Sequence, residues 1–294
     1  MTNTQLQLLV KIAETGSFTK AGHALNMTQP AVSRAVSTLE DELGVKLILR
    51  DRRNGIVLTG VGSRVLVLFR EILNGFEKVE QEIAAEKGLE VGNIRIGTFT
   101  SASAYFLPKI IRTIGEKYPN LQFDLHEGTI DEIRSWLESR QIDVGFTIMK
   151  DEQFEMLPLL REEMFAVIRE DHPLSERTSV RIEELEHEPM IICKGGFEAP
   201  IYELFAQAHT PLKPKFVVSN LTTLLNMIHE GLGSAIMSGM MLAYQPSNVT
   251  TRAIEPRAYR DIYMAVPSFD EAPLAVKLFI RTALELFGPA KNSQ

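Results

Sequence analysis

The sequence predicts a mixed α and α/β protein, in which a small helical head with a β-hairpin is joined by one long helix to a larger α/β region. Three short helical patterns and an Asn-Gly pair occupy residues 1 to 59, and one amphipathic pattern runs through about 60 to 88. From about residue 89 onwards, apolar strand-like runs alternate with helical patterns. At 294 residues the chain is long enough for roughly two domains of about 150 residues.

The composition is that of an ordinary globular protein, with 45% apolar and 23% charged residues. This balance excludes collagen-like, disordered and disulfide-scaffold chains. No run approaches the roughly 18 apolar residues of a membrane span, so we expect no membrane partner. Residues 1 to 10 lack the basic and apolar regions of a secretory signal, so we expect a cytoplasmic protein. A single cysteine, Cys193, excludes an intramolecular disulfide.

The net charge of -7 is distributed unevenly along the chain. Residues 1 to 64 hold eight Lys and Arg against five Asp and Glu, which gives +3. The remaining 23 basic and 33 acidic residues give -10. A basic head on an acidic body lets the head approach phosphates while the body repels them.

The head begins with two short helices. Apolar residues recur at helical spacing over residues 4 to 15, and Gly16 ends that pattern. A second helix is predicted from about Thr19 to Leu25, where Ala21 and Ala24 are small enough for close packing, and it ends at Asn26.

A third helix follows after a tight turn. Thr28 can cap it, Pro30 suits its first turn, and Gly44 ends it. One side of this helix is apolar and the other polar. The apolar side holds Val32, Val36, Leu39 and Leu43, and the polar side holds Gln29, Ser33, Arg34 and Ser37.

A β-hairpin is predicted directly after the third helix. Two β-prone runs, 46 to 53 and 56 to 59, flank Asn54-Gly55, and this pair tolerates the positive φ angles of a tight hairpin turn. Three arginines lie near its tip: Arg50, Arg52 and Arg53.

Together, the helix pair and the hairpin predict a winged helix-turn-helix that binds duplex DNA. The second helix of such a pair enters the major groove, where Gln29, Ser33 and Arg34 can reach base edges, and Arg52 and Arg53 would meet the flanking backbone. In the competing interpretation, Gln29, Ser33 and Ser37 are only a solvated helix face. The basic charge of the head, the tight turn between its second and third helices, the cap of the third helix and the arginine-bearing hairpin occur together in these residues. This combination favours DNA binding.

At this point the chain resembles the LysR-type transcriptional regulators. The likeness is strong in the head, continues through 92 to 97 and is looser beyond residue 150. Ile48 departs from the family pattern, which usually has an aromatic residue there. The matching residues are Phe18-Thr-Lys-Ala21, Ala24-Leu25, Thr28-Gln-Pro-Ala-Val-Ser33-Arg34, Leu39-Glu40, Leu43-Gly44, Leu47, Arg50, Leu58-Thr59 and Gly62. The DNA-binding residues that the motif and the resemblance imply are Phe18, Thr19, Thr28, Gln29, Pro30, Ser33, Arg34, Ser37, Arg50, Arg52 and Arg53.

One long helix is predicted over about 60 to 88. Its apolar residues recur on average every 3.6 positions, and too little neighbouring sequence is available to cover them, so we expect the helix to pair with a second copy of itself. These residues are Val65, Leu68, Ile72, Phe76, Val79 and Ile83. The resemblance further implies a tetramer built from two dimers, an inverted-repeat operator in duplex DNA, and RNA polymerase as a candidate partner.

Beyond Gly92 the alternation of strands and helices predicts two α/β lobes with parallel strands. The first lobe is assigned to about 89 to 162 and 266 to 294, and the second to about 163 to 265. The complete division is a winged helix-turn-helix at 1 to 59, a linker and dimerisation helix at 60 to 88, and an effector-binding domain at 89 to 294. The resemblance implies that this domain is built like the periplasmic solute-binding proteins.

A small-molecule effector, with an anion as one option, is expected between the lobes, because ligands of such sheets bind beyond the carboxyl ends of the strands. Hydroxyl and amide side chains follow several predicted strands, and the family's pocket favours Ser101, Thr129 and Thr147. In the competing interpretation these residues only cap helices and Lys194 is a solvated lysine. The candidate effector-binding residues are Thr100, Ser101, Ser103, Thr129, Thr147, Lys194 and Asn220.

Signals for catalysis are weak, so we expect a regulator with no enzymatic activity, cofactor or metal. The run Asp124-Leu-His126-Glu127 reads as surface, because Glu127 points away from the other two on a strand. Cys193 reads as an inert apolar residue, and Met240 and Met241 read as core. A solute-binding protein or an α/β enzyme with a non-functional helical head remain the rival classes, and neither explains the basic head.

Overall fold

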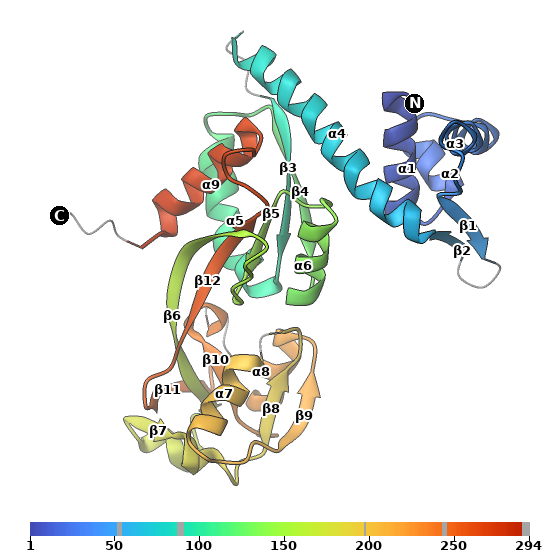
Figure 1. Ribbon diagram of the computed structural model, residues 1–294. Coiled ribbons are helices and arrows are strands. Elements are labelled where there is room, and N and C mark those ends of the chain that lie inside the picture. Colours follow the sequence, from blue (N-terminus) through green and yellow to red (C-terminus); the bar gives the residue numbers. More distant parts are fainter. Residues whose placement is uncertain (52–54, 87–90, 197, 243–245, 290–294) are drawn as a thin grey trace. The chain divides into compact units, whose positions relative to one another are not determined.

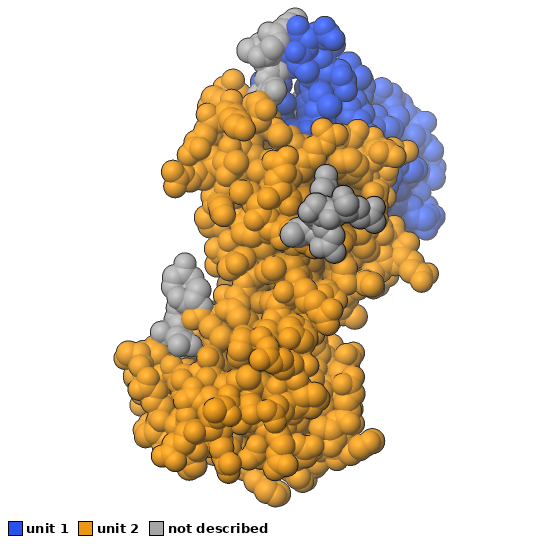
Figure 2. Space-filling view, turned by 90° about the vertical axis from the view of Figure 1, so that its left-hand side faces the viewer, with its two compact units in different colours: residues 1–92, 138–141, 273–275 blue, residues 93–137, 142–272, 276–294 orange. Residues whose placement is uncertain are grey.

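A computed structural model describes residues 1–51, 55–86, 91–196, 198–242 and 246–289. The chain divides into two compact units (Figure 2). The first comprises residues 1–92 with 138–141 and 273–275, and the second comprises 93–137, 142–272 and 276–294. The part of the chain that the structure describes contains no helix long and apolar enough to cross a membrane.

Three helices form the head as the sequence predicts: α1 (Asn3–Thr15), α2 (Phe18–Ala24) and α3 (Gln29–Leu43). The side chains of Thr2 and Gln5 form a reciprocal capping box at the start of α1. Gly16 and Gly44 end α1 and α3 in the left-handed conformation that glycine adopts most easily.

The turn between α2 and α3 depends on close backbone contact. The N–H of Met27 donates to the carbonyl oxygen of Gly22 over 2.8 Å. A Cβ atom at Gly22 would lie 2.7 Å from the carbonyl oxygen of Met27, so only glycine fits there. Thr28 occupies the N-cap position of α3, but the prediction that its side chain caps the helix is wrong, since its hydroxyl makes no capping bond.

The predicted hairpin is present as β1 (Ile48–Asp51) and β2 (Gly55–Leu58), which pair antiparallel. The predicted two-residue Asn-Gly turn is wrong, because Gly55 pairs with Asp51 and therefore belongs to a strand. The connection is residues 52–54, and these lie outside the described residues.

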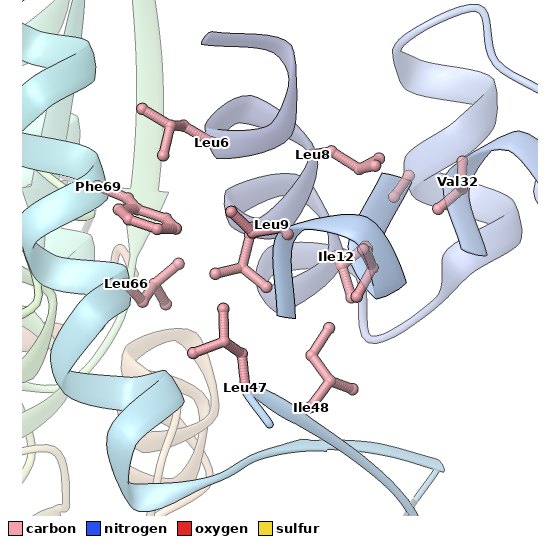
Figure 3. Close-up of a cluster of buried hydrophobic side chains, with 12 residues drawn as sticks. Leu6, Leu8, Leu9, Ile12, Val32, Leu47, Ile48, Leu66 and Phe69 are labelled. Atoms are coloured by element: carbon pink, nitrogen blue, oxygen red, sulfur yellow. The ribbon is translucent and has the colours of Figure 1, made fainter. Parts of the chain in front are cut away.

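The apolar faces of the head and of α4 (Gly60–Glu86) converge on one core (Figure 3). Leu8 of α1 lies on the side of Val32 of α3, and Leu9 of α1 lies on the side of Leu66 and Phe69 of α4. Thr59 fixes the start of α4, because its hydroxyl accepts the N–H of Gly62 and donates to the carbonyl oxygen of Lys46. The β1–β2 hairpin, which is the wing of the predicted winged helix-turn-helix, and α4 are thereby held against the same core.

A different face of α4 is apolar and exposed in the single chain. We call it the α4 stripe, and it consists of Leu68, Ile72, Phe76, Val79 and Ile83.

The second unit is built on an eight-stranded sheet whose path runs β4-β3-β5-β12-β6-β11-β7, with β10 also paired to β6. A separate two-stranded sheet pairs β8 with β9 (Figure 1). The strands are β3 (Gly92–Thr98), β4 (Leu121–Glu127), β5 (Val144–Thr147), β6 (Glu155–Arg169), β7 (Ser179–Arg181), β8 (Met190–Cys193), β9 (Pro214–Val218), β10 (Ala235–Ser238), β11 (Val249–Glu255) and β12 (Tyr259–Val266).

The strand directions agree only in part with the predicted parallel sheets. β3 pairs parallel with β5, and β8 pairs parallel with β9. β6 and β12 pair antiparallel over most of their length, and they pass from one lobe to the other (Figure 1). This pairing was not predicted, because it joins segments about a hundred residues apart that show no βαβ pattern.

Helices cover both lobes. The first helix of the second unit, α5, begins at Thr100 directly after Phe99, so Ser101 and Ser103 lie in its first turn. Buried side chains of α7, α8 and β10 form two apolar clusters in the second lobe. The helices are α5 (Thr100–Gly115), α6 (Ile130–Glu138), α7 (Ala199–Gln207), α8 (Leu221–His229) and α9 (Leu274–Phe287), with short 3-10 helices η1 (Pro173–Glu176), η2 (Ile182–Leu185) and η3 (Gly239–Leu242).

Candidate nucleic-acid interface and ligand cleft

The polar face of α3 is presented outwards. Gln29, Arg34 and Ser37 are exposed, whereas Val32 and Val36 on the opposite face are buried in the core of the head. A helix with buried apolar anchors and exposed polar residues at one face can be inserted into a groove without disturbing its own packing.

The other predicted DNA-binding residues have different positions. Thr19, Thr28 and Pro30 are exposed, while Ser33 is half-buried. Phe18 packs against the core of the head, which makes it a support for α2. Arg50 lies in β1, and Arg52 and Arg53 fall outside the described residues.

Glu40 connects α3 to the wing, and the sequence analysis missed this role. One carboxylate oxygen accepts the N–H groups of Leu47, over 2.8 Å, and Ile48, over 3.1 Å, and the other accepts Lys46 Nζ over 2.7 Å. Burial alone raises the pKa of Glu40, but the hydrogen bonds from Lys46, Ile48 and Leu47 outweigh burial and hold the pKa below its ordinary value. The buried carboxylate therefore fixes the angle between α3 and the hairpin.

A cavity of about 570 Å³ lies between the two lobes of the second unit. Thr100 and Ser101 reach it from the first turn of α5, and Asn220 reaches it from the start of α8. Three of the seven predicted effector-binding residues therefore line one cleft. Asn220 lies about 120 positions after Thr100 and Ser101 in the sequence. The Asn220 Oδ1 atom accepts the N–H of Thr223, and the amide N–H groups of Asn220 have no acceptor among the residues that the structure describes.

The other four predicted effector-binding residues are not among the residues that line this cleft. Ser103 is half-buried on α5, and Lys194 is exposed, with its backbone N–H donating to Val218. The Thr129 hydroxyl and N–H both donate to the carboxylate of Glu132, in a capping box at the start of α6. Thr147 accepts the N–H of Met149 and lines a second cavity of about 520 Å³ in the first lobe.

Several lining residues were missed by the sequence analysis. Cys193 lies at the carboxyl end of β8 and lines the cleft. It could have been predicted as a lining residue, because ligands of such sheets bind beyond the carboxyl ends of the strands. Burial, and the negative charge of Glu198, raise the pKa of the Cys193 thiol, so its neutral form is favoured. Met240 and Met241 are buried, as the sequence predicted, and they also line the cleft. The remaining lining residues are Ala104, Tyr105, Ser219, Leu221, Thr222, Leu225, Asn226 and Pro246.

A buried ion pair supports the cleft from the strands that join the lobes. Arg260 Nε of β12 donates to Glu162 Oε1 of β6 over 2.5 Å, and both side chains are nearly inaccessible to solvent. The other oxygen of Glu162 accepts the N–H of Met240 over 3.0 Å. The crossing strands therefore hold the first residues of η3, which line the cleft, in place.

Two family models match the chain. The model described as a bacterial regulatory helix-turn-helix protein of the lysR family matches residues 3–63, and the LysR substrate binding domain matches residues 87–288. The chain is also 55% identical over 290 residues to a Bacillus subtilis protein named as the uncharacterized HTH-type transcriptional regulator YvbU. That alignment covers 98% of this chain and 99% of the relative.

Solved structures show the same fold over nearly the whole chain. A full-length OxyR variant from Pseudomonas aeruginosa is 22% identical, with a TM-score of 0.78, and the match covers 96% of this chain and 97% of that one. Full-length CbnR in complex with its target DNA is also 22% identical, with a TM-score of 0.66 and coverage of 97% and 99%. With these matches the predicted fold class is confirmed. The chain belongs to the LysR family of transcriptional regulators, with a helix-turn-helix domain for DNA at its amino end and a substrate-binding domain after α4.

Proposed function

We propose that the protein acts as a dimer in which each head reads one half of an inverted-repeat operator, and that a small molecule in the cleft controls this binding. The observation that carries the proposal is the meeting of Thr100, Ser101 and Asn220 in one cavity, in a chain whose α3 presents Gln29, Arg34 and Ser37 to solvent. Such a chain has both a DNA-reading surface and an internal ligand site.

The exposed α4 stripe supports the dimer. Phe76 is 50% exposed and Val79 is 57% exposed, and large apolar residues at helical spacing on one exposed face are typical of a helix that packs against another. Two copies joined along this stripe would carry two copies of α3, whose separation must match turns of the duplex. A further association of two dimers, contact with RNA polymerase and a cytoplasmic location belong to the same proposal.

Within this proposal the predicted site residues have distinct roles. Gln29, Ser33, Arg34 and Ser37 would approach bases and phosphates from α3, and Arg50, Arg52 and Arg53 would meet the flanking backbone from the wing. Thr100, Ser101 and Asn220 would hydrogen-bond the effector. Closure of the lobes around the effector would alter the angle or spacing of the two heads, and with it the affinity or the bend of the DNA.

Covalent occupation of the cleft tests the proposal without knowledge of the effector. Cys193 is the only cysteine of the chain and lines the cavity, so a bulky maleimide attached to it would fill the cleft. We expect labelled full-length protein to give an altered DNase I footprint on genomic fragments that it binds. The Cys193→Ser variant, treated with the same reagent, should keep the original footprint. Identical footprints for labelled and unlabelled native protein would reject control by the cleft.

A further inference from the structure

The lining of the cleft carries no formal charge. None of its described lining residues is Asp, Glu, Lys, Arg or His. The chemical character of the occupant must therefore be matched by hydroxyls, amides, one thiol and apolar groups.

Three charged residues close to the lining, Lys194 and Glu198 in the sequence and Arg260 through its pair with Glu162, are not among the lining residues. The Glu198 carboxylate accepts the N–H groups of Gly195 and Gly196. Arg260 is paired with Glu162 through Nε, its buried Nη2 has no hydrogen-bond partner among the described residues, and its side chain is not among the lining of the cleft. Lys194 is exposed and does not line the cavity. A ligand with two or more charges would lose its hydration in this cleft without gaining an opposite charge, which is strongly unfavourable.

One end of the cleft is nevertheless suited to a single polar head. Ser101 is 8% exposed and lines the cavity, and among the described residues its hydroxyl has no hydrogen-bond partner. It lies in the first turn of the 16-residue helix α5, whose N-cap residue Phe99 supplies no side-chain cap. The first N–H groups of a helix have no acceptor within it, and the helix dipole places about half a positive charge there. A carbonyl, an amide or one carboxylate satisfies such donors.

Beside its hydroxyl and amide groups, the cleft has a large apolar surface. Leu221 and Leu225 contribute from α8, and Met240 and Met241 contribute from η3. Methionine side chains adapt to the shape of an apolar group, because they are unbranched and polarisable. A cavity of about 570 Å³ has room for a body of ring size or for a branched chain beside the polar head.

We infer that the effector is an amphipathic small molecule with an apolar body and one polar head that is neutral or singly negative. This inference rests on the proposed function, since it assigns the chemical class of the ligand to the same cleft. It excludes dicarboxylates, phosphorylated compounds and amines as effectors of this chain.

The test measures protection of Cys193 from alkylation by N-ethylmaleimide in the full-length protein. The probes are 3-phenylpropionate, 3-phenylpropionamide, phenylsuccinate and succinate at equal millimolar concentration. The first two carry an apolar body with a singly charged or neutral head, the third has a second carboxylate, and the fourth has no apolar body. We expect the first two to slow alkylation at least about tenfold more than either dicarboxylate, which corresponds to about 1.4 kcal/mol of binding free energy.

Four variants make the result specific to the cleft. Cys193→Ser gives the background, because it removes the only thiol. Ser101→Ala should weaken protection by 3-phenylpropionate about fivefold through the loss of one hydrogen bond, whereas Ser103→Ala, on the same helix but outside the lining, should not. Thr222→Lys introduces a cation at the exposed start of α8 and should let phenylsuccinate protect as well as 3-phenylpropionate.

Protection by succinate or phenylsuccinate equal to that by 3-phenylpropionate in the native protein would overturn the inference. Failure of both phenylpropionate and its amide to protect Cys193 would overturn it as well. The assay contains no DNA, so either failure concerns only the class of ligand. Failure of the proposed function would appear separately, as a footprint that does not respond to an occupied cleft.

Discussion

The backbone N–H of Ile130 donates to the carbonyl oxygen of Gly195 over 3.1 Å, and this hydrogen bond joins the two lobes of the substrate-binding domain directly. Gly196 packs against the same residue, since a Cβ atom there would lie 2.8 Å from Ile130 Cβ. Glu198 stabilises the segment that follows β8, because its carboxylate accepts the N–H groups of Gly195 and Gly196. This contact between the lobes therefore requires glycine at position 196.

The change Gly196→Ala should weaken this contact. Gly196 has a φ of +86°, where a side chain is strained, and the added methyl group would meet Ile130. We expect a loss of about 1–3 kcal/mol in the free energy of unfolding of the domain, and faster hydrogen exchange at the Ile130 amide. Gly115→Ala is the matched control, because nothing lies within 4 Å of its Cβ position, and it should be neutral or stabilise α5. Equal effects of the two changes would contradict this account of the contact.

Arg34 is exposed on α3, and Arg34→Ala should lower DNA affinity through loss of a contact with phosphate or guanine. If the contact is to phosphate, the slope of log affinity against log salt should become shallower by about one for each head. Fluorescence anisotropy across a range of salt concentrations measures both quantities. Lys11→Ala is the control, because Lys11 lies on α1 and is paired with Glu14. A slope and an affinity unchanged in Arg34→Ala would remove this residue from the interface.

The stabilisation of the wing by the Glu40 carboxylate should depend on pH. Its pKa in the folded chain lies below the ordinary value of 4.5, so its stabilising effect is complete above that value and is lost as the pH falls through the lower, folded value. Hydrogen-exchange protection of the Leu47 and Ile48 amides, corrected for intrinsic exchange, should fall over this acidic range. Glu40→Gln should remove the pH dependence and cost about 1–3 kcal/mol at neutral pH.

Glu14→Gln serves as the comparison, because Glu14 is exposed and forms an ion pair with Lys11 on the surface of α1. It should leave the exchange of both amides unchanged. Acid-insensitive protection in the native protein would show that the Glu40 carboxylate does not hold the wing.

The α4 stripe should control assembly. Phe76→Glu places a charge among exposed apolar residues, so we expect sedimentation to show a shift towards monomers. The affinity for a complete operator should then fall by about a hundredfold or more, because the two heads no longer bind as one unit. Ala85→Glu changes an exposed residue of the same helix outside the stripe and should preserve both properties. A dimer that withstands Phe76→Glu would place the interface elsewhere.

The sequence was most informative where structure depends on neighbouring residues. Gly16 and Gly44 end α1 and α3 at the predicted places, since helix ends are governed by local backbone preference. α2 ends at Ala24, two residues before the predicted break at Asn26, and Asn26 has a positive φ angle. Thr129 shows how one feature can have two explanations. A hydroxyl at the start of a helix suggested a ligand site, yet Glu132 three residues later completes a capping box, and that spacing was readable in the sequence.

Features that depend on distant segments could not be predicted from local patterns. The Glu162–Arg260 pair joins residues 98 positions apart, and nothing near either residue indicates the other. The hydrogen bond between Ile130 and Gly195 uses backbone groups that every residue except proline possesses. The cleft likewise joins Ser101 to Asn220 only because β6 and β12 set the two lobes against each other.

The central claim is that α3 of this chain reads DNA sequence. The most direct measurement is selection of random duplexes by the full-length protein, followed by sequencing, with Arg34→Ala in parallel. The account predicts enrichment of an inverted repeat whose half-sites are spaced by about one or more turns of the duplex, with weaker enrichment by the variant. Recovery of no sequence above the random background by the native protein would contradict it.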